Sequence, residues 1–417
     1  MSVENNVPEI RFKGFSGEWV EHKLQDLTEN GFSNGVFNDP QKVGKGYRLI
    51  NVKDMYSGDC IDVDGLSLVD IDEKEFKNNK VQYGDIFFTR SSLVKEGIAY
   101  SNVNLSDRSD LTFDGHLIRM QPCKATTDPV FLASLFKTSS ARKQLILGGK
   151  TTTMTTIGQS DIAIVELALP EKQEQTAIGN TFQKLDNLIN QHQQKHDKLS
   201  NIKKAMLEHM FPKQGETTPE IRFKGFSGAW ESKVLGSVAS FYKGKGLPKS
   251  SIQDDGLCPC IHYGELFTKY SEVIEIVTSK TNQTDNFFSI SNDVLMPTSD
   301  VTPKGLVKSC CVKQNGIVLG GDILVIRPND QNVIDGEFLS RFIRTREQQV
   351  LQNVTGSTVF HLYASSIENL DIVFPSIEQQ KAIGNYFQKL DALINQHQQQ
   401  IIKLNNIKQA CLSKMFV

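Results

Sequence analysis

The most regular pattern of apolar and polar positions in this chain occurs twice. From Ile178 to Met210, seam positions that are mostly apolar follow one another at alternating spacings of four and three residues, and the same spacings run from Ile383 to Met415. A 3.5-residue repeat sustained over this length predicts a long α-helix whose narrow apolar seam is buried against a similar helix. We therefore expect two helices, each roughly 55–60 Å long, that pair as an antiparallel coiled coil.

The two helical stretches are alike well beyond this seam. Residues 170–211 and 375–416 align without a gap at an offset of 205, and 27 of the 42 positions are identical. The identical positions include polar residues that the pattern places on the outer face: Asn180, Gln183, Lys184, Asn190 and Gln191. Pairing of the helices with each other could explain the similarity of the seam, whereas identity on the outer face favours one kind of partner bound twice.

The repeat extends over the whole chain. Residues 8–19 (PEIRFKGFSGEW) return at 219–230 with 11 of 12 positions identical, and the segment between each such opener and its helix aligns more weakly with its counterpart. The expected parts are an opener at 1–20, a globular domain at 21–165, a long helix with linker at 166–218, an opener with a second globular domain at 219–370, and a second long helix at 371–417. A repeat of this kind predicts pseudo-twofold symmetry, with the first opener beside the end of the second helix.

Each globular domain combines strand and helix patterns. Short apolar runs at 86–89, 117–120, 294–296 and 323–327 are bounded by turn-forming residues, and one helix is expected at 129–147, with its counterpart at 336–352. The predicted fold class is therefore α+β: two α/β globular domains, each on a curved or partly closed sheet, separated by the two long antiparallel helices. Cys310 and Cys311 are expected in a buried strand.

Composition excludes several classes of protein. The chain has 417 residues, of which 39% are hydrophobic and 23% charged, with a net charge of −2. No apolar run reaches the length of a membrane span, the first residues do not form a signal peptide, and the seven irregularly spaced cysteines fit a reducing cytoplasm. A net negative charge argues mildly against a nucleic-acid partner unless basic residues gather on one face.

Such local basic stretches occur at the same place in both globular domains. Residues 131–160 contain no acidic residue, and residues 338–367 contain only one. The candidate phosphate-binding residues in these stretches are Lys137, Arg142, Lys143, Lys150, Arg341, Arg344 and His361. A solvated helix face is the alternative explanation for a basic helix, and recurrence in both domains favours phosphate binding.

Short polar side chains follow the strand that the two domains share. Such residues can donate to and accept from base edges, and arginine can bind guanine through two hydrogen bonds. The candidate base-contacting residues here and in the turn before each long helix are Arg90, Ser91, Ser92, Thr151, Thr298, Ser299, Ser357 and Thr358. Glycine-rich segments at 31–35 and 243–250, the second with Lys245 and Lys249, form another candidate set of loops.

Other motifs carry weaker signals. The segment from Gly148 to Thr151 resembles the end of a phosphate-binding loop, but Gln144 stands where the earlier glycine is required. Cys258, Cys260 and His262 lack a second ligand pair with zinc spacing. His192 and His397 occupy matching seam positions, and polar seam residues usually set the register of paired helices, so we expect buried, hydrogen-bonded histidines, with metal binding or catalysis as the alternatives.

Two variable domains and two repeated helices, each opened by Pro-x-x-x-x-Gln-x-x-Ile, resemble the specificity subunit of type I restriction–modification enzymes. The motif is Pro170, Gln175 and Ile178 in the first copy and Pro375, Gln380 and Ile383 in the second, and a turn rich in glycine, serine and threonine precedes each helix at 150–153 and 356–358. The resemblance covers nearly all 417 residues. It implies a non-catalytic protein whose two target-recognition domains each read half of a split DNA site.

The resemblance also implies partners and cofactors. The helices would act as a spacer and dock two methyltransferase (modification) subunits, which restriction subunits join. This chain would bind no cofactor or metal itself, and the partner subunits would use S-adenosylmethionine, ATP and Mg²⁺. Two alternatives remain at the level of sequence: a coiled-coil interaction scaffold that reads no DNA, and an enzyme with unrecognised catalytic motifs.

Overall fold

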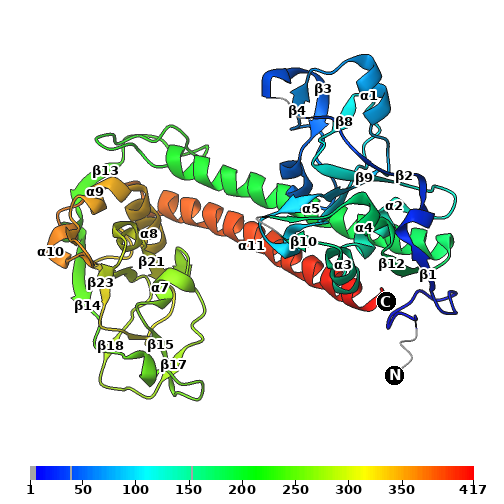
Figure 1. The fold of residues 1–417 in the computed structure, drawn as a ribbon. Helices are drawn as coiled ribbons and strands as arrows, with labels where there is room; N and C mark the ends of the chain where they lie inside the picture. Colours follow the sequence, from blue (N-terminus) through cyan, green and yellow to red (C-terminus); the bar gives the residue numbers. More distant parts are fainter. Residues whose placement is uncertain (1–5, 38–39, 152–153) are drawn as a thin grey trace. The chain divides into compact units, whose positions relative to one another are not determined.

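The computed structural model describes residues 6–37, 40–151 and 154–417, and its chain forms two units (Figure 1). Unit 1 consists of Met1–Gln194 and His397–Val417, and unit 2 of Lys195–Gln396. The two predicted helices are α5 (Lys172–His209) and α11 (Ile377–Lys414), each of 38 residues. Each unit therefore combines a globular domain with the first part of one long helix and the last part of the other.

The helices run antiparallel within each unit. In unit 1, Asp186 and His192 of α5 contact Lys408 and His397 of α11, so residue numbers rise along one helix as they fall along the other. The two histidines are half-buried and their Nδ1 atoms lie 2.9 Å apart, which confirms the predicted hydrogen-bonded pair. In unit 2, Lys203 of α5 contacts Asp391 of α11.

The globular domain of unit 1 is built on a four-stranded antiparallel sheet in the order β2-β9-β5-β7. Smaller sheets have the orders β4-β3-β8, β1-β12 and β10-β11-β6. The strands are β1 (Val20–Lys23), β2 (Thr28–Asn34), β3 (Val43–Ile50), β4 (Ser67–Val69), β5 (Ile86–Thr89), β6 (Ser91–Ser92), β7 (Ser101–Val103), β8 (Leu111–Phe113), β9 (Leu117–Pro122), β10 (Lys150–Thr151), β11 (Thr155–Thr156) and β12 (Glu166–Leu169). Its helices are α1 (Glu73–Asn79), α2 (Pro129–Leu135), α3 (Ser139–Leu147) and α4 (Gln159–Ala163).

The globular domain of unit 2 repeats this plan. Its main sheet has the order β14-β23-β19-β21-β16, and the other sheets are β17-β15-β22-β18, β13-β26 and β20-β25-β24. The strands are β13 (Glu231–Val234), β14 (Ala239–Lys243), β15 (Cys258–Ile261), β16 (Val273–Ile274), β17 (Lys280–Thr281), β18 (Phe287–Phe288), β19 (Val294–Pro297), β20 (Ser299–Asp300), β21 (Cys310–Val312), β22 (Val318–Leu319), β23 (Ile323–Pro328), β24 (Thr355–Gly356), β25 (Phe360–His361) and β26 (Asp371–Phe374). Its helices are α6 (Leu235–Val238), α7 (Glu265–Thr268), α8 (Gly336–Thr345), α9 (Glu347–Leu351) and α10 (Ala364–Ile367).

The four central strands correspond between the units in order and direction, which confirms the mixed α+β class and the shared fold of the two domains. Cys310 and Cys311 lie in β21 and are fully buried, as predicted.

The prediction of one helix at 129–147 was wrong, because Thr138 has extended backbone angles and its side chain caps α3 by accepting from the Ala141 amide. The counterpart is likewise split, at Arg346. Residues 31–34 are part of β2, so the first glycine-rich segment is not a free loop.

The motif that opens each long helix ties it to its globular domain. The side chain of Gln175 donates to the carbonyls of Pro170 and Thr126 and accepts from the amide of Asp128. Gln380 makes the same three kinds of bond, donating to Pro375 and Val333 and accepting from Asp335. Both glutamines are buried, so an apolar replacement would leave buried backbone groups unpaired, and this requirement explains the motif.

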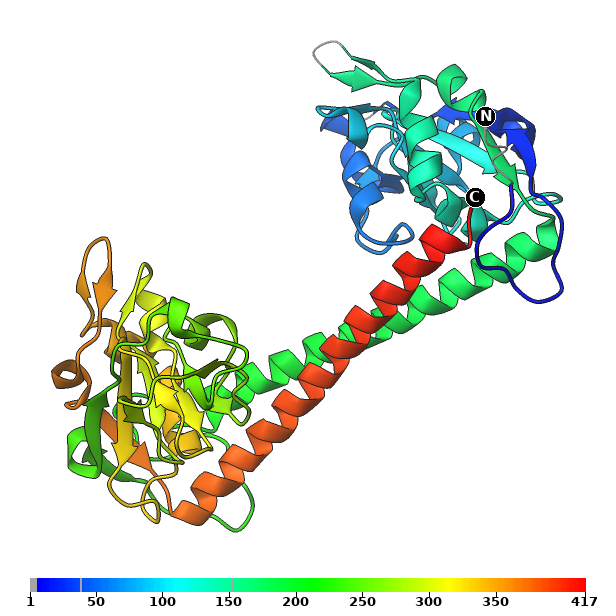
Figure 2. The same ribbon diagram turned by 90° about the horizontal axis from the view of Figure 1, so that it is seen from below.

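The openers lie beside the ends of the helices, as the repeat predicts. The Ile10 amide donates to the Lys414 carbonyl at 2.8 Å in unit 1, and the Ile221 amide donates to the His209 carbonyl at 2.9 Å in unit 2. In unit 1 the opener therefore lies beside the C-terminal end of the chain (Figure 2). Trp19 of the opener packs edge-on against Phe131 and Phe416, which places the end of α11 in the core of the domain.

Candidate nucleic-acid interface

Polar segments that are far apart in the sequence meet in one small sheet of unit 1. Ser91 and Ser92 of β6 pair with Thr156 and Thr155 of β11, and β11 pairs in turn with β10, which holds Lys150 and Thr151. We call these three strands the first polar sheet. Figure 2 shows its β10–β11 hairpin, in blue-green, projecting from the body of unit 1. The sequence predicted DNA-contacting residues in the two outer strands, β6 and β10, but it did not predict that these strands belong to one sheet. Thr152 and Thr153 lie outside the described residues.

Unit 2 contains a matching second polar sheet. Ser299 and Asp300 of β20 pair with His361 and Phe360 of β25, and β25 pairs with β24. Ser357 and Thr358 are exposed at the turn between β24 and β25, in the hairpin drawn in orange in Figure 2, and Thr298 directly precedes β20. Two sheets of the same order, at matching places in both units, are therefore lined by hydroxyl, imidazole and carboxylate groups.

Sequence reasoning missed the apolar side chains beside these sheets. Leu93, directly after β6, is 82% exposed, and Val301, directly after β20, is 70% exposed. The two positions match at the offset of 208 that relates the shared strands. Exposed apolar residues therefore stand at matched positions beside both polar sheets. In the sequence, each of the two could have been recognised as an apolar residue that follows a series of polar residues.

The predicted cations of unit 1 divide into two groups. Lys137 lies 3.1 Å from the carboxylate of Asp59, and Arg142 donates to the backbone carbonyls of Glu96, Ile98 and Ala99, so both side chains hold the domain together. Burial lowers the pKa of Arg142, in keeping with its enclosed position. Arg90, Lys143 and Lys150 are exposed, and only Lys150 of these has an acidic neighbour, Asp161 at 3.7 Å, among the ion pairs of the described residues.

The arginines predicted to bind phosphate in unit 2 hold structural positions instead. Arg341 is fully buried and contacts Glu337 and Asp391, and Arg344 contacts Glu272 and donates to the Ser309 carbonyl. A buried guanidinium with two carboxylate partners cannot reach a phosphate in this structure, so Arg341 does not belong to the interface. Lys245 and Lys249 are exposed, and Lys245 lies 2.7 Å from Asp285.

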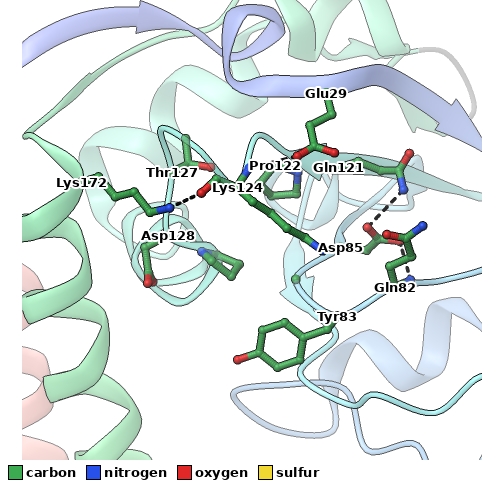
Figure 3. A pocket seen from close by; sticks show the side chains of 12 residues that line it. Glu29, Gln82, Tyr83, Asp85, Gln121, Pro122, Lys124, Thr127, Asp128 and Lys172 are labelled. Carbon is green, nitrogen blue, oxygen red and sulfur yellow. Dashed lines mark hydrogen bonds between the residues drawn. The ribbon is translucent and has the colours of Figure 1, made fainter.

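A small pocket of about 170 Å³ lies in unit 1 near the start of α5 (Figure 3). Its Asp85 carboxylate accepts from the Gln82 amide at 2.9 Å and from the Gln121 side chain at 3.4 Å. Burial raises the pKa of Asp85 to about 6, outweighing these bonds and the charge of Arg119. At the offset of 208, Asp293 of unit 2 matches Asp85, but its carboxylate pairs with Arg327 and Asn292 stands at the position of Gly84. The pocket is therefore not part of the repeated interface.

Nowhere in 6–37, 40–151 and 154–417 do three or more His, Cys, Asp or Glu side chains gather so that they could hold a metal ion. None of the helices in those ranges combines the length and apolar character needed to cross a membrane.

Two α+β domains of one fold, each followed by one of two matching long helices, define a two-domain protein with an internal repeat. The model of the type I restriction modification DNA specificity domain matches residues 16–201 and 228–406, one match in each half. The chain belongs to this family. As a specificity subunit it provides the DNA sequence specificity of a type I restriction–modification system and is not itself an enzyme.

Known relatives match either nearly all or about half of the chain. A putative type I restriction enzyme MjaX specificity subunit from Methanocaldococcus jannaschii is 23% identical over 401 residues, covering 94% of this chain and 91% of that protein. The type I restriction enzyme EcoKI specificity subunit of Escherichia coli is 27% identical over 203 residues, 47% of this chain and 42% of its own length. The crystal structure of the S subunit from M. genitalium superposes with a TM-score of 0.60 at 15% identity, covering 99% of both chains, and so shares the fold.

Proposed function

We propose that residues 21–165 and 219–370 of this specificity subunit each read one half of a split DNA site, and that the two polar sheets make the base contacts. The observation that carries this proposal is the recurrence of the three-stranded polar sheet in both domains, with different side chains on each. A shared scaffold with different side chains is what two different half-sites require. The long helices act as the spacer between them.

The side chains of the sheets suit base edges. In unit 1, Arg90 can donate two hydrogen bonds to a guanine, while the hydroxyls of Ser91, Ser92 and Thr156 can donate or accept. In unit 2, His361 and Asp300 replace two of these hydroxyls, since they occupy the positions of Thr156 and Ser92 in the matching sheet. A narrow β-ribbon fits the major groove, where each base pair presents a distinct set of donors and acceptors.

The exposed apolar residues complete the reading surface. Leu93 and Val301 contact thymine methyl groups in this proposal, because an apolar side chain beside polar ones distinguishes thymine from cytosine in the major groove. Replacing Leu93 with Ala is expected to relax the preference at one position of one half-site, by at most the roughly 1–3 kcal/mol that one base pair of a site contributes. An unchanged preference at every position would contradict this role.

Long-read methylation mapping of the source cell, with and without this gene, tests the proposed function. A split motif whose methylation disappears on deletion is the expected result, and it would define both half-sites. Exchange of residues 21–165 for those of another family member is expected to change one half-site only. A change in both halves would contradict independent reading.

A stripe of identical residues on the two long helices supports docking of one kind of partner twice. Leu188 and Leu393 are each 43% exposed although both are large and apolar, and they stand at matching positions. Exposed residues on the same face are also identical in the two helices; they are Asn180, Lys184 and Gln191 in α5 and Asn385, Lys389 and Gln396 in α11. We propose that each stripe docks a methyltransferase subunit, that restriction subunits join this core, and that these partners supply the sites for S-adenosylmethionine, ATP and Mg²⁺.

Stoichiometry tests the docking proposal. Leu188→Glu is expected to reduce the number of methyltransferase subunits bound per chain from two to one, as measured by native mass spectrometry of the purified complex, and Leu188→Glu with Leu393→Glu to abolish binding. The matched control is Ile164→Glu, a similarly exposed apolar position outside the helices. Two bound subunits in the double variant would rule out these stripes as the docking surface.

A further inference from the structure

We propose that one charge cluster in each unit sets the orientation of the globular domain on the long helices. Both helices and the domain contribute residues to each cluster. The orientation in turn sets the spacer length that the protein accepts between its half-sites. This inference rests on the proposed reading of a split site and assigns positioning residues to it. We call the two sets of residues, defined below, the unit 1 and unit 2 charge clusters.

The unit 1 charge cluster consists of Lys408, Asp186, Asp59 and Lys137. The ammonium of Lys408 in α11 lies 2.6 Å from the carboxylate of Asp186 in α5 and 2.5 Å from that of Asp59 in the globular domain. Lys137, which follows α2, approaches the same Asp59 carboxylate at 3.1 Å and also donates to its backbone carbonyl. One lysine thus joins both helices to the domain, and a second lysine holds the domain's carboxylate in place.

The unit 2 charge cluster has the same arrangement, with Lys203, Asp391, Glu272 and Arg344. Lys203 of α5 lies 2.6 Å from Asp391 of α11 and 3.0 Å from Glu272 of the globular domain, and Arg344 approaches Glu272 at 3.6 Å. The helical lysines and aspartates occupy identical repeat positions, with an offset of 205 in both cases. The domain carboxylates lie in segments that differ in sequence, yet each reaches the helical lysine of its own unit.

The helical lysine of unit 1 and the domain carboxylate of unit 2 are enclosed, whereas Asp59 is 37% exposed. The side chain of Lys408 is 10% exposed and that of Glu272 is 9% exposed. Burial works against the ionised form of Glu272, but the positive charges of Arg344, Lys203 and Arg341 prevail and lower its pKa to about 2. An ion pair that is shielded from water and made by several partners at once constrains geometry far more than an exposed surface pair does.

Each cluster provides a second point of attachment. In unit 1 the first attachment is apolar: Phe182 of α5 and Phe416, beyond the end of α11, pack into the core of the domain. Lys408 lies two turns before Phe416, and Asp186 one turn after Phe182, so the charge cluster holds the domain at a different level along the helices. A body attached at one place can tilt about it, whereas attachment at two places restricts the tilt.

Restricted tilt matters because each additional base pair displaces a half-site by about 3.4 Å and rotates it by roughly 35° around the duplex. A domain held in one orientation rejects a site whose partner half is displaced in this way. A domain that tilts more freely accepts it. The expected consequence of weakening a cluster is therefore a broader range of accepted spacers, with unchanged base preferences in each half-site.

The test uses the full chain with its partner subunits in a cell from which the wild-type gene has been removed. The variant Asp59→Asn with Glu272→Gln removes the negative charge of the globular domain from both clusters but leaves the Lys408–Asp186 and Lys203–Asp391 pairs between the helices. Long-read sequencing then measures methylation at genomic sites with the wild-type spacer and at sites with one base pair more or fewer. We expect the preference for the wild-type spacer to fall by roughly 2- to 30-fold, the range for mutations that weaken coupling between distant sites.

The control variant is Asp62→Asn with Glu275→Gln, which makes the same chemical changes three residues further along at exposed positions. It is expected to keep the wild-type preference. The conservative variant Asp59→Glu with Glu272→Asp retains the charges and is expected to restore most of the preference. Methylation that falls equally at all spacers, or a preference that stays at the wild-type value, would overturn the inference. A wild-type complex that methylates no split motif would overturn both the inference and the proposed function.

Discussion

Removal of two exposed lysines in unit 1 is expected to weaken DNA binding in a manner that depends on salt. The sequence pointed to four cations here, but the structure leaves only Lys143 and Lys150 available, because Lys137 pairs with Asp59 and Arg142 is bonded to three backbone carbonyls. The informative variant is therefore Lys143→Ala with Lys150→Ala, and not the replacement of all four. Both lysines are exposed, so neither change disturbs the core.

The magnitude follows from counterion release. Each phosphate contact contributes about 0.9 to the slope of log K against log salt, so loss of two contacts reduces that slope by about 1.8. Between 50 and 200 mM salt, wild-type affinity should consequently fall about 12-fold more than the affinity of the variant. Base preferences should stay the same, since phosphate contacts position the protein without reading sequence.

The assay is fluorescence anisotropy of the assembled complex on a duplex carrying its mapped site, titrated at several salt concentrations. Lys13→Ala with Lys224→Ala is the control, because these lysines are exposed at matching positions of the two openers. Equal slopes for wild type and the Lys143/Lys150 variant would refute the reasoning, since they would show that these lysines contact no phosphate. A reduced slope in the control would show that the effect is not local.

Three further outcomes are expected from buried groups. Phe416→Ala should destabilise unit 1 by about 3–5 kcal/mol, visible as faster amide exchange throughout its core, because the ring packs on Trp19 and Phe131. Arg341→Met should cost about 1.5–3 kcal/mol in denaturant unfolding, because Glu337 and Asp391 each lose one cationic partner while keeping Lys313 and Lys203, whereas an altered salt slope with intact stability would contradict its structural role. The pKa of Glu272 is lowered to about 2 in the folded protein, whereas a glutamate in the unfolded chain has a pKa of about 4.3. The ionised carboxylate therefore stabilises unit 2 fully above about pH 4.3, and this stabilisation is lost as the pH falls towards about 2. In Glu272→Gln that part of the pH dependence should disappear from thermal unfolding curves, and an unchanged curve would show that Glu272 is not ionised as described.

Some features of this protein could be predicted from sequence because their causes are local or repeated. The long helices follow from a periodicity that each turn repeats, the histidine pair follows from matching seam positions, and the position of each opener beside the end of a long helix follows from the internal repeat. The break at Thr138 was missed because a threonine can continue a helix or cap the next one, and only the packing around it decides which.

The candidate site was predicted less completely. Two-residue strands such as β6, β11 and β25 carry almost no periodic signal, so their assembly into a sheet depends on partners that are distant in the sequence. The basic helices correctly indicated that some cations are exposed, but they did not show which ones. Arg341 and Lys143 look alike in sequence as cations on short helices, yet one is fully buried and the other is exposed.

The sequence by itself determined the internal repeat, the two long helices, the α+β class and the family resemblance, since all of these rest on patterns that extend over many residues. Only the tertiary structure decided which cations remain free for DNA, which polar segments form one surface, and which acids meet Lys203 and Lys408. The physical reason is that the role of a charged side chain depends on its partners and its exposure to water. Both are set by contacts between residues far apart in the chain.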